Sequence, residues 1–109
     1  MNLEFSYGQG GYQDDQQQAK GEIILGPHKL YLRGPEGDLV RTYVPLDKIE
    51  RMTRKGDTVT LFIRPSMSLR YVVSFKGDRT LMEDLTRDIA QRRGLKKRFL
   101  RTEWFEEGA

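Results

Sequence analysis

The residues of this chain that could do chemistry are basic and aromatic side chains close to its C-terminus. Six of the ten residues from Arg92 to Arg101 are positively charged, and the aromatic pair Trp104 and Phe105 follows them. Clustered Lys and Arg side chains attract phosphate and carboxylate groups. Trp and Phe side chains are frequent anchors of protein interfaces. The pattern therefore predicts binding chemistry.

Groups that would support catalysis are scarce in this composition. The chain has no cysteine and a single histidine, His28, which lies in the turn pattern Gly26-Pro27-His28-Lys29. A surface histidine is the better interpretation of this position than a Ser-His-Asp arrangement. Thiolate or imidazole metal sites lack their ligands, and no acidic segment has calcium-loop spacing. We expect no enzyme activity, no cofactor, no metal and no small-molecule substrate.

The size and charge of the chain further restrict the class of protein to which it can belong. Its 109 residues suit one domain, and the net charge of +3 is unevenly distributed. Residues 1–19 carry three acids and no base, whereas residues 87–101 carry seven bases and one acid. No apolar run has the length of a signal peptide or membrane span, so the sequence predicts a cytoplasmic protein, as does the absence of cysteine.

Short segments with alternating apolar and polar residues predict antiparallel strands. The alternation of Leu3, Phe5 and Tyr7 favours one more short strand that pairs with the main sheet. Turn residues fill the short gaps, and gaps of this length exclude parallel crossovers, which need a dozen or more residues. The predicted strands are 22–25, 29–33, 39–44, 48–54, 58–64 and 69–76.

One amphipathic helix follows the last strand. Leu81, Leu85 and Ile89 recur every fourth residue and share a face. Thr80 has capping-box spacing to Glu83, and Gly94 ends the helix. Only a sheet can cover the apolar stripe. We therefore predict an α+β, mainly β fold, in which six to seven strands form a bent antiparallel sheet or partly open barrel capped by the C-terminal helix.

This layout resembles the pleckstrin-homology (PH) superfold, and most closely its bacterial PH-like and GRAM-like modules. The resemblance covers residues 20–94 and is carried by the patterns of 21–25, 29–32 and, above all, Val44-Pro45-Leu46-Asp47-Lys48-Ile49-Glu50-Arg51-Met52. It implies a bent sheet plugged by the helix and a binding module of bacterial type.

Phosphoinositide recognition does not transfer with the resemblance. The members that bind phosphoinositides have a lysine and a basic-x-basic pair across the first hairpin, and Lys29 and Arg33 lack that spacing. Those members also usually carry a tryptophan in the helix, whereas Trp104 lies beyond Gly94. No functional residue is carried over from the family.

The chain divides into three predicted segments: a polar Gly/Gln-rich arm at 1–19, a PH-like domain at 20–94 and a basic-aromatic tail at 95–109. The arm has too few apolar residues to offset the entropy of ordering, so we expect it to be flexible. Three arrangements of the tail stay open. It restarts the helix, stays extended with its aromatic residues offered to another protein, or packs on its own domain.

A second candidate surface is the outward face of the strands. Alternation that points Val59, Leu61, Ile63, Leu69, Tyr71, Val73 and Phe75 inward sends Phe62, Arg64, Arg70 and Lys76 outward. Arginines among aromatic rings can hold bases, anionic peptides or headgroups, although the solvated face of an antiparallel sheet often looks the same. The candidate anion-binding residues are Arg33, Arg64, Arg70, Arg92, Arg93, Lys96, Lys97, Arg98 and Arg101, and the candidate partner-binding residues are Phe99, Trp104 and Phe105.

Two functions follow from these surfaces. The leading hypothesis is a non-catalytic binding or scaffolding module that acts through protein contacts and self-associates by its C-terminal segment. The alternative is binding of nucleic acid or an anionic membrane surface by the basic segment and the sheet arginines. Affinity that falls steeply with salt distinguishes the alternative from the leading hypothesis.

Overall fold

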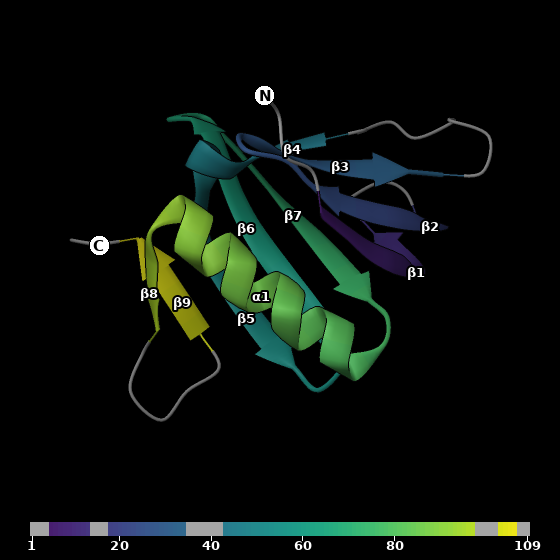
Figure 1. Cartoon of the computed structure of the whole chain (residues 1–109). Coiled ribbons are helices and arrows are strands. Elements are labelled where there is room, and N and C mark those ends of the chain that lie inside the picture. The colour runs from purple at the N-terminus through teal and green to yellow at the C-terminus, as the bar shows by residue number, and fades with distance from the viewer. Residues whose placement is uncertain (1–4, 14–17, 35–42, 98–102, 107–109) are drawn as a thin grey trace.

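The computed structural model describes residues 5–13, 18–34, 43–97 and 103–106 (Figure 1). The described residues form one nine-stranded sheet and one α-helix, so the fold is mainly β, as predicted, with more strands than expected. The elements are β1 (Phe5–Gln13), β2 (Gln18–Leu25), β3 (Lys29–Arg33), β4 (Tyr43–Pro45), the 3-10 turn η1 (Leu46–Lys48), β5 (Ile49–Lys55), β6 (Thr58–Ser66), β7 (Leu69–Lys76), α1 (Arg79–Arg93), β8 (Leu95–Lys97) and β9 (Glu103–Glu106).

The sheet is open and antiparallel throughout. Its strand order is β4-β3-β2-β1-β7-β6-β5-β9-β8, so two meanders, β1–β4 and β5–β7, meet where β1 pairs with β7. The C-terminal pair β8–β9 extends the sheet beyond β5. The predicted bounds of β3 and β7 are confirmed, whereas 39–42 of the predicted fourth strand lie outside the described residues.

The helix α1 lies across one face of the sheet, in front of β5 and β6 in Figure 1. Leu85 and Ile89 are fully buried, and Leu81 is half-buried at the border of the core, which confirms the predicted stripe. Gly94 ends the helix in the left-handed conformation at φ 80°, and its N–H donates to Ala90 O. Among the described residues, no helix combines the length and apolar composition that crossing a membrane requires.

The helix begins differently from the prediction. Asp78 is the N-cap, and its carboxylate accepts a hydrogen bond from Leu81 N–H at 3.2 Å, while Thr80 is exposed inside the first turn. An aspartate caps a helix at least as well as a threonine. The capping-box spacing of Thr80 and Glu83 was therefore a coincidence of sequence.

The core lies between α1 and the inner face of the sheet. It contains the predicted inward residues of β6 and β7 with one exception, because Leu69 is 52% exposed. Leu69 pairs with Ser66, beyond the Ile63–Ile49 pair where β5 starts, so it lies in the part of the hairpin that continues past β5. The inward residues that are buried are Val59, Leu61, Ile63, Tyr71, Val73 and Phe75.

Residues 5–13 of the N-terminal segment are part of the sheet, which corrects the prediction of a flexible arm for residues 8–13. The strand β1 lies between β2 and β7, and its Tyr7 and Tyr12 side chains are buried in the core. Backbone hydrogen bonds to two neighbours and two large rings hold a strand that has few apolar residues. The short strand predicted around Phe5 and Tyr7 is confirmed and runs further than expected, while 1–4 lie outside the described residues.

The described parts of the C-terminal segment, 95–97 and 103–106, also belong to the domain, so the predicted boundary between 94 and 95 does not separate them from it. Leu95 of β8 and Trp104 of β9 are members of the core cluster. Of the three arrangements considered, packing on its own domain is the one observed for these two parts. The helix does not restart at 95–97 or 103–106, which are strands.

Candidate functional site

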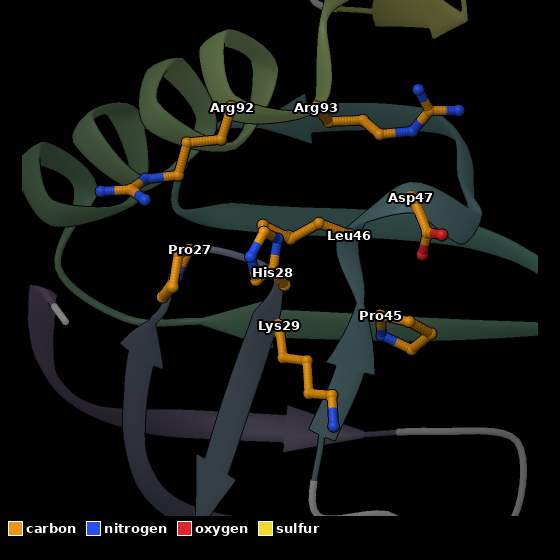
Figure 2. Close-up of a pocket in the computed structure, with 8 residues that line it drawn as sticks. All are labelled: Pro27, His28, Lys29, Pro45, Leu46, Asp47, Arg92 and Arg93. Carbon is orange, nitrogen blue, oxygen red and sulfur yellow. The ribbon is translucent and has the colours of Figure 1, made fainter. Parts of the chain in front are cut away.

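A pocket of about 370 Å³ opens where three separate elements meet. One wall is the turn between β2 and β3, another is the segment from β4 into η1, and the third is the C-terminal end of α1 (Figure 2). We call it the basic pocket. Its lining residues are Pro27, His28, Lys29, Pro45, Leu46, Asp47, Arg92 and Arg93.

Backbone contacts hold the first two walls together. Gly26 N–H donates to Lys29 O at 2.8 Å and closes the tight turn between β2 and β3. Leu46 N–H donates to His28 O at 3.0 Å, and the Leu46 side chain is buried in the core. The segment around Leu46 that carries the family resemblance therefore fixes the shape of the pocket.

The third wall is tied to the sheet by the two arginines themselves. Arg92 Nη1 donates to Gly26 O at 3.5 Å, and Arg93 Nε donates to Ile49 O at 3.0 Å. Positive charge is favourable at the C-terminal end of a helix, where carbonyl groups point outward. Arg92 and Arg93 thus anchor the end of α1 while they place positive charge on the rim of the pocket.

The charged groups of the basic pocket diverge (Figure 2). The guanidinium groups of Arg92 and Arg93 extend to opposite sides of His28, and Lys29 points away from the helix. Lys29 Nζ lies 4.4 Å from the centroid of the Tyr43 ring. Asp47 lies on the same side as Arg93. Because the cations do not converge on one point, the pocket suits an extended anionic partner better than a single enclosed phosphate.

Two more of the predicted anion-binding residues lie at the same end of the molecule. Figure 1 places the tip of the β6–β7 hairpin beside η1 and the C-terminal end of α1. Arg64 and Arg70 flank this tip, and Arg70 Nε lies 3.9 Å from a Glu50 carboxylate oxygen. Together with Lys48 of η1 and the bases of the pocket, they form what we call the basic end: Lys29, Lys48, Arg64, Arg70, Arg92 and Arg93.

The remaining predicted anion-binding residues are not gathered there. Arg33 is exposed at the opposite end of β3 from Lys29, and Lys96 is exposed on β8. The side chain of Lys97 and the whole of Arg98 and Arg101 lie outside what the structure describes.

The predicted partner-binding residues have a different environment from the one expected. Trp104 is 9% exposed and lies opposite Met52 in the β5–β9 pairing. An anchor role for Trp104 in another protein would require β9 to leave the sheet. Phe105 pairs with Arg51 through the backbone, and Phe99 lies outside the described residues. Partner binding through these three residues stays a prediction.

Sequence reasoning missed two exposed apolar residues at the basic end. Met67 is 85% exposed, and the neighbouring Leu69 is half exposed. A methionine at the centre of the hairpin segment Pro65-Ser66-Met67-Ser68 was the available signal, because polar residues are usual at such a position.

A partly buried pair of ionisable groups, Tyr7 and Asp88, joins β1 to α1. The Tyr7 hydroxyl donates a hydrogen bond to Asp88. Burial, and then this hydrogen bond, raise the pKa of Tyr7 well above its usual value. Within the described part of the chain, no three His, Asp or Glu side chains gather as a metal site. The Tyr7–Asp88 hydrogen bond links the two elements directly.

The Tyr7 pair predicts a loss of stability in alkali. An unfolded tyrosine ionises near pH 10, whereas folded Tyr7 keeps its proton to higher pH. The stabilisation is complete below about pH 10 and is lost as the pH rises toward the folded pKa, because the unfolded state then holds fewer protons. Urea unfolding at about pH 9 and about pH 11 should show a larger loss for the wild type than for Tyr7→Phe. Equal losses in the two proteins would contradict the assignment, since all other tyrosines are common to both.

Comparison of the sequence with protein-family models and with curated proteins finds no match.

Proposed function

We propose that this chain is a cytoplasmic, non-catalytic binding module of PH-like fold that docks on an anionic membrane surface through its basic end. The fold part of the proposal is supported by the element order. The strands β1–β7 and the helix α1 give seven antiparallel strands and one helix, which is the PH-like layout, and β8–β9 are an addition to it.

The observation that carries the functional part is the gathering of bases from separate elements at one end of the molecule. The turn after β2, η1, the β6–β7 hairpin and the end of α1 all contribute. Asp47 and Glu50 lie among the six bases, and Asp88 lies near Arg92, since both of these charges act on Tyr7. The six bases exceed these three acids by about three charges, so the end has a positive potential that attracts anionic surfaces.

A membrane fits the geometry better than a nucleic acid does. The cations come from separate elements and do not converge on one point, so an extended anionic surface can contact several of them at once. A nucleic-acid strand is usually bound along a groove in which aromatic rings stack on the bases. Phe62, the ring on the outer face of β6, is already covered by Arg51, whose Cζ lies 3.9 Å from the ring centroid.

The expected affinity from charge alone is modest. Each Lys or Arg near an anionic leaflet contributes about 1 kcal/mol, so about three net charges give about 3 kcal/mol. That free energy corresponds to a dissociation constant of about 6 mM. Electrostatic attraction alone therefore gives reversible, salt-sensitive docking. Tighter binding requires a second contribution to the binding free energy.

The test compares two charge-matched variants on vesicles with and without phosphatidylserine. Lys48→Gln with Arg70→Gln removes two exposed bases of the basic end, and Lys55→Gln with Lys76→Gln removes two exposed bases at the other end of β5 and β7. The first variant should bind anionic vesicles about 30-fold more weakly, since two charges contribute about 2 kcal/mol. The second should lose far less.

Three results would contradict the proposal. Equal losses in the two variants would mean that net charge matters and the basic end does not. Binding to RNA or duplex DNA with none to vesicles would assign the basic end to nucleic acid. No binding to any of these partners at low salt would leave the basic end without an anionic ligand.

A further inference from the structure

The β6–β7 hairpin ends in an exposed apolar tip at the basic end of the molecule. Met67 is 85% exposed and Leu69 is 52% exposed, the two highest values among the exposed large apolar side chains of the described residues. Single exposed apolar residues are ordinary on protein surfaces. Here two of them, Met67 and Leu69, lie at one hairpin tip, an arrangement that favours a binding role.

The tip extends beyond the strand next to it. The pairing of β5 with β6 starts at Ile49 and Ile63, so the segment from Arg64 to Leu69 continues past the β5 edge. The register of the hairpin shifts between Ile63 and Ser66, with the extra residue on β6. Ser66 and Ser68 lie on either side of Met67, with their hydroxyl oxygens 3.5 Å apart. The result is a narrow projection with small polar residues beside one large apolar side chain.

Each strand of the hairpin carries an arginine close to the tip, Arg64 on β6 and Arg70 on β7. Arg64 Nη2 donates to Met67 Sδ at 3.1 Å, and the Arg70 side chain is 64% exposed. Long basic side chains can keep their charge at the level of lipid phosphates while neighbouring apolar groups enter the acyl boundary. The order of residues from tip to base is therefore apolar first and basic second.

We propose that the β6–β7 tip is a wedge that inserts Met67 and Leu69 into the interface of an anionic membrane, with Arg64 and Arg70 at the phosphate level. The inference rests on the proposed function, and the wedge supplies an apolar contribution to the free energy of membrane binding. Charge complementarity selects a lipid surface over an apolar protein groove, because Arg64 and Arg70 lie on either side of the apolar tip. Transfer of each side chain out of water should strengthen binding by about tenfold.

The test uses the full chain, vesicles containing phosphatidylserine, and the variant Met67→Ser with Leu69→Ser. The variant keeps the net charge and changes only exposed side chains, so it should stay folded. Its partition onto vesicles should fall by about 100-fold, while the slope of affinity against salt stays that of the wild type. At about 1 M salt, where the Debye length is about 3 Å, only the wild type should keep residual binding.

A conservative variant is the matched control. Exchanging the two side chains, Met67→Leu with Leu69→Met, should keep wild-type binding, because only apolar area matters at the tip. An unchanged partition for the serine variant would overturn the wedge, and it would leave the proposed function in place if Lys48→Gln with Arg70→Gln still weakens binding. A concentration-dependent dimer that only the serine variant loses would assign the tip to self-association and overturn the wedge. A wild type that binds no vesicles would remove both proposals.

Discussion

Replacing Trp104 by alanine is expected to lower the free energy of unfolding by about 3 kcal/mol or more. The Trp104 side chain is a member of the core cluster, and β9 pairs with β5 over only three residues, Arg51, Met52 and Thr53. Removing the ring leaves a cavity and takes away the largest contact that holds β9 on the sheet. Urea unfolding followed by far-UV circular dichroism measures the effect.

The matched control for this prediction is Met67→Ala. Met67 is 85% exposed, so its truncation should change stability by no more than about 0.5 kcal/mol. A Trp104→Ala protein as stable as the wild type would contradict the packing of β9. It would instead favour the hypothesis that Trp104 serves as an anchor for another protein.

Gly21→Ala is the second substitution with a large expected effect. A Cβ at this position would overlap the carbonyl oxygen of Arg33 and the hydroxyl of Tyr12, and would lie 2.8 Å from the Arg33 carbonyl carbon. The Arg33 backbone is paired with Glu22 in the β2–β3 ladder, so it cannot retreat without breaking that pairing. We expect a loss of about 3 kcal/mol, at the upper end of the usual cost of overpacking.

Lys20→Ala is the control for Gly21→Ala, because Lys20 is the adjacent exposed residue of the same strand. It should leave the unfolding midpoint nearly unchanged. Adding Tyr12→Phe to Gly21→Ala should restore only part of the stability, since it removes the hydroxyl clash and leaves the clash with the Arg33 carbonyl. Full restoration would show that the backbone approach at Gly21 is not the limiting contact.

The parts of the fold that sequence predicts are those with a local period. Val59, Leu61 and Ile63 alternate with outward-facing residues along β6, and this spacing predicts which face of the strand is buried. The repeat of Leu85 and Ile89 predicts the buried face of α1 in the same way. The strand β1 shows such a period only at its start, around Phe5 and Tyr7. Beyond that point Tyr12 is its described buried side chain, and its stability comes from two neighbouring strands. The four residues of β9 are too few to show a period.

The candidate site, too, could be predicted from the sequence only where its residues form a local pattern. Arg92 and Arg93 were predicted from a run of bases along the chain. Their neighbours in the pocket, His28 and Asp47, are distant in sequence and come together only through hydrogen bonds such as Leu46 N–H to His28 O. The tip was missed for another reason. The predicted inward alternation assigned Leu69 to the core, and the alternation of β7 does not show that the hairpin continues past the start of β5.

The most direct test of the docking end is to measure which end of the molecule enters the lipid interface. The chain has no cysteine, so one introduced cysteine is a unique attachment point for an environment-sensitive fluorophore. With Met67→Cys, phosphatidylserine vesicles should shift the emission to the blue and shield the dye from an aqueous quencher. With Lys55→Cys, at the other end of β5, neither change should occur. A response at Lys55→Cys, or the same response at both positions, would contradict docking through the basic end.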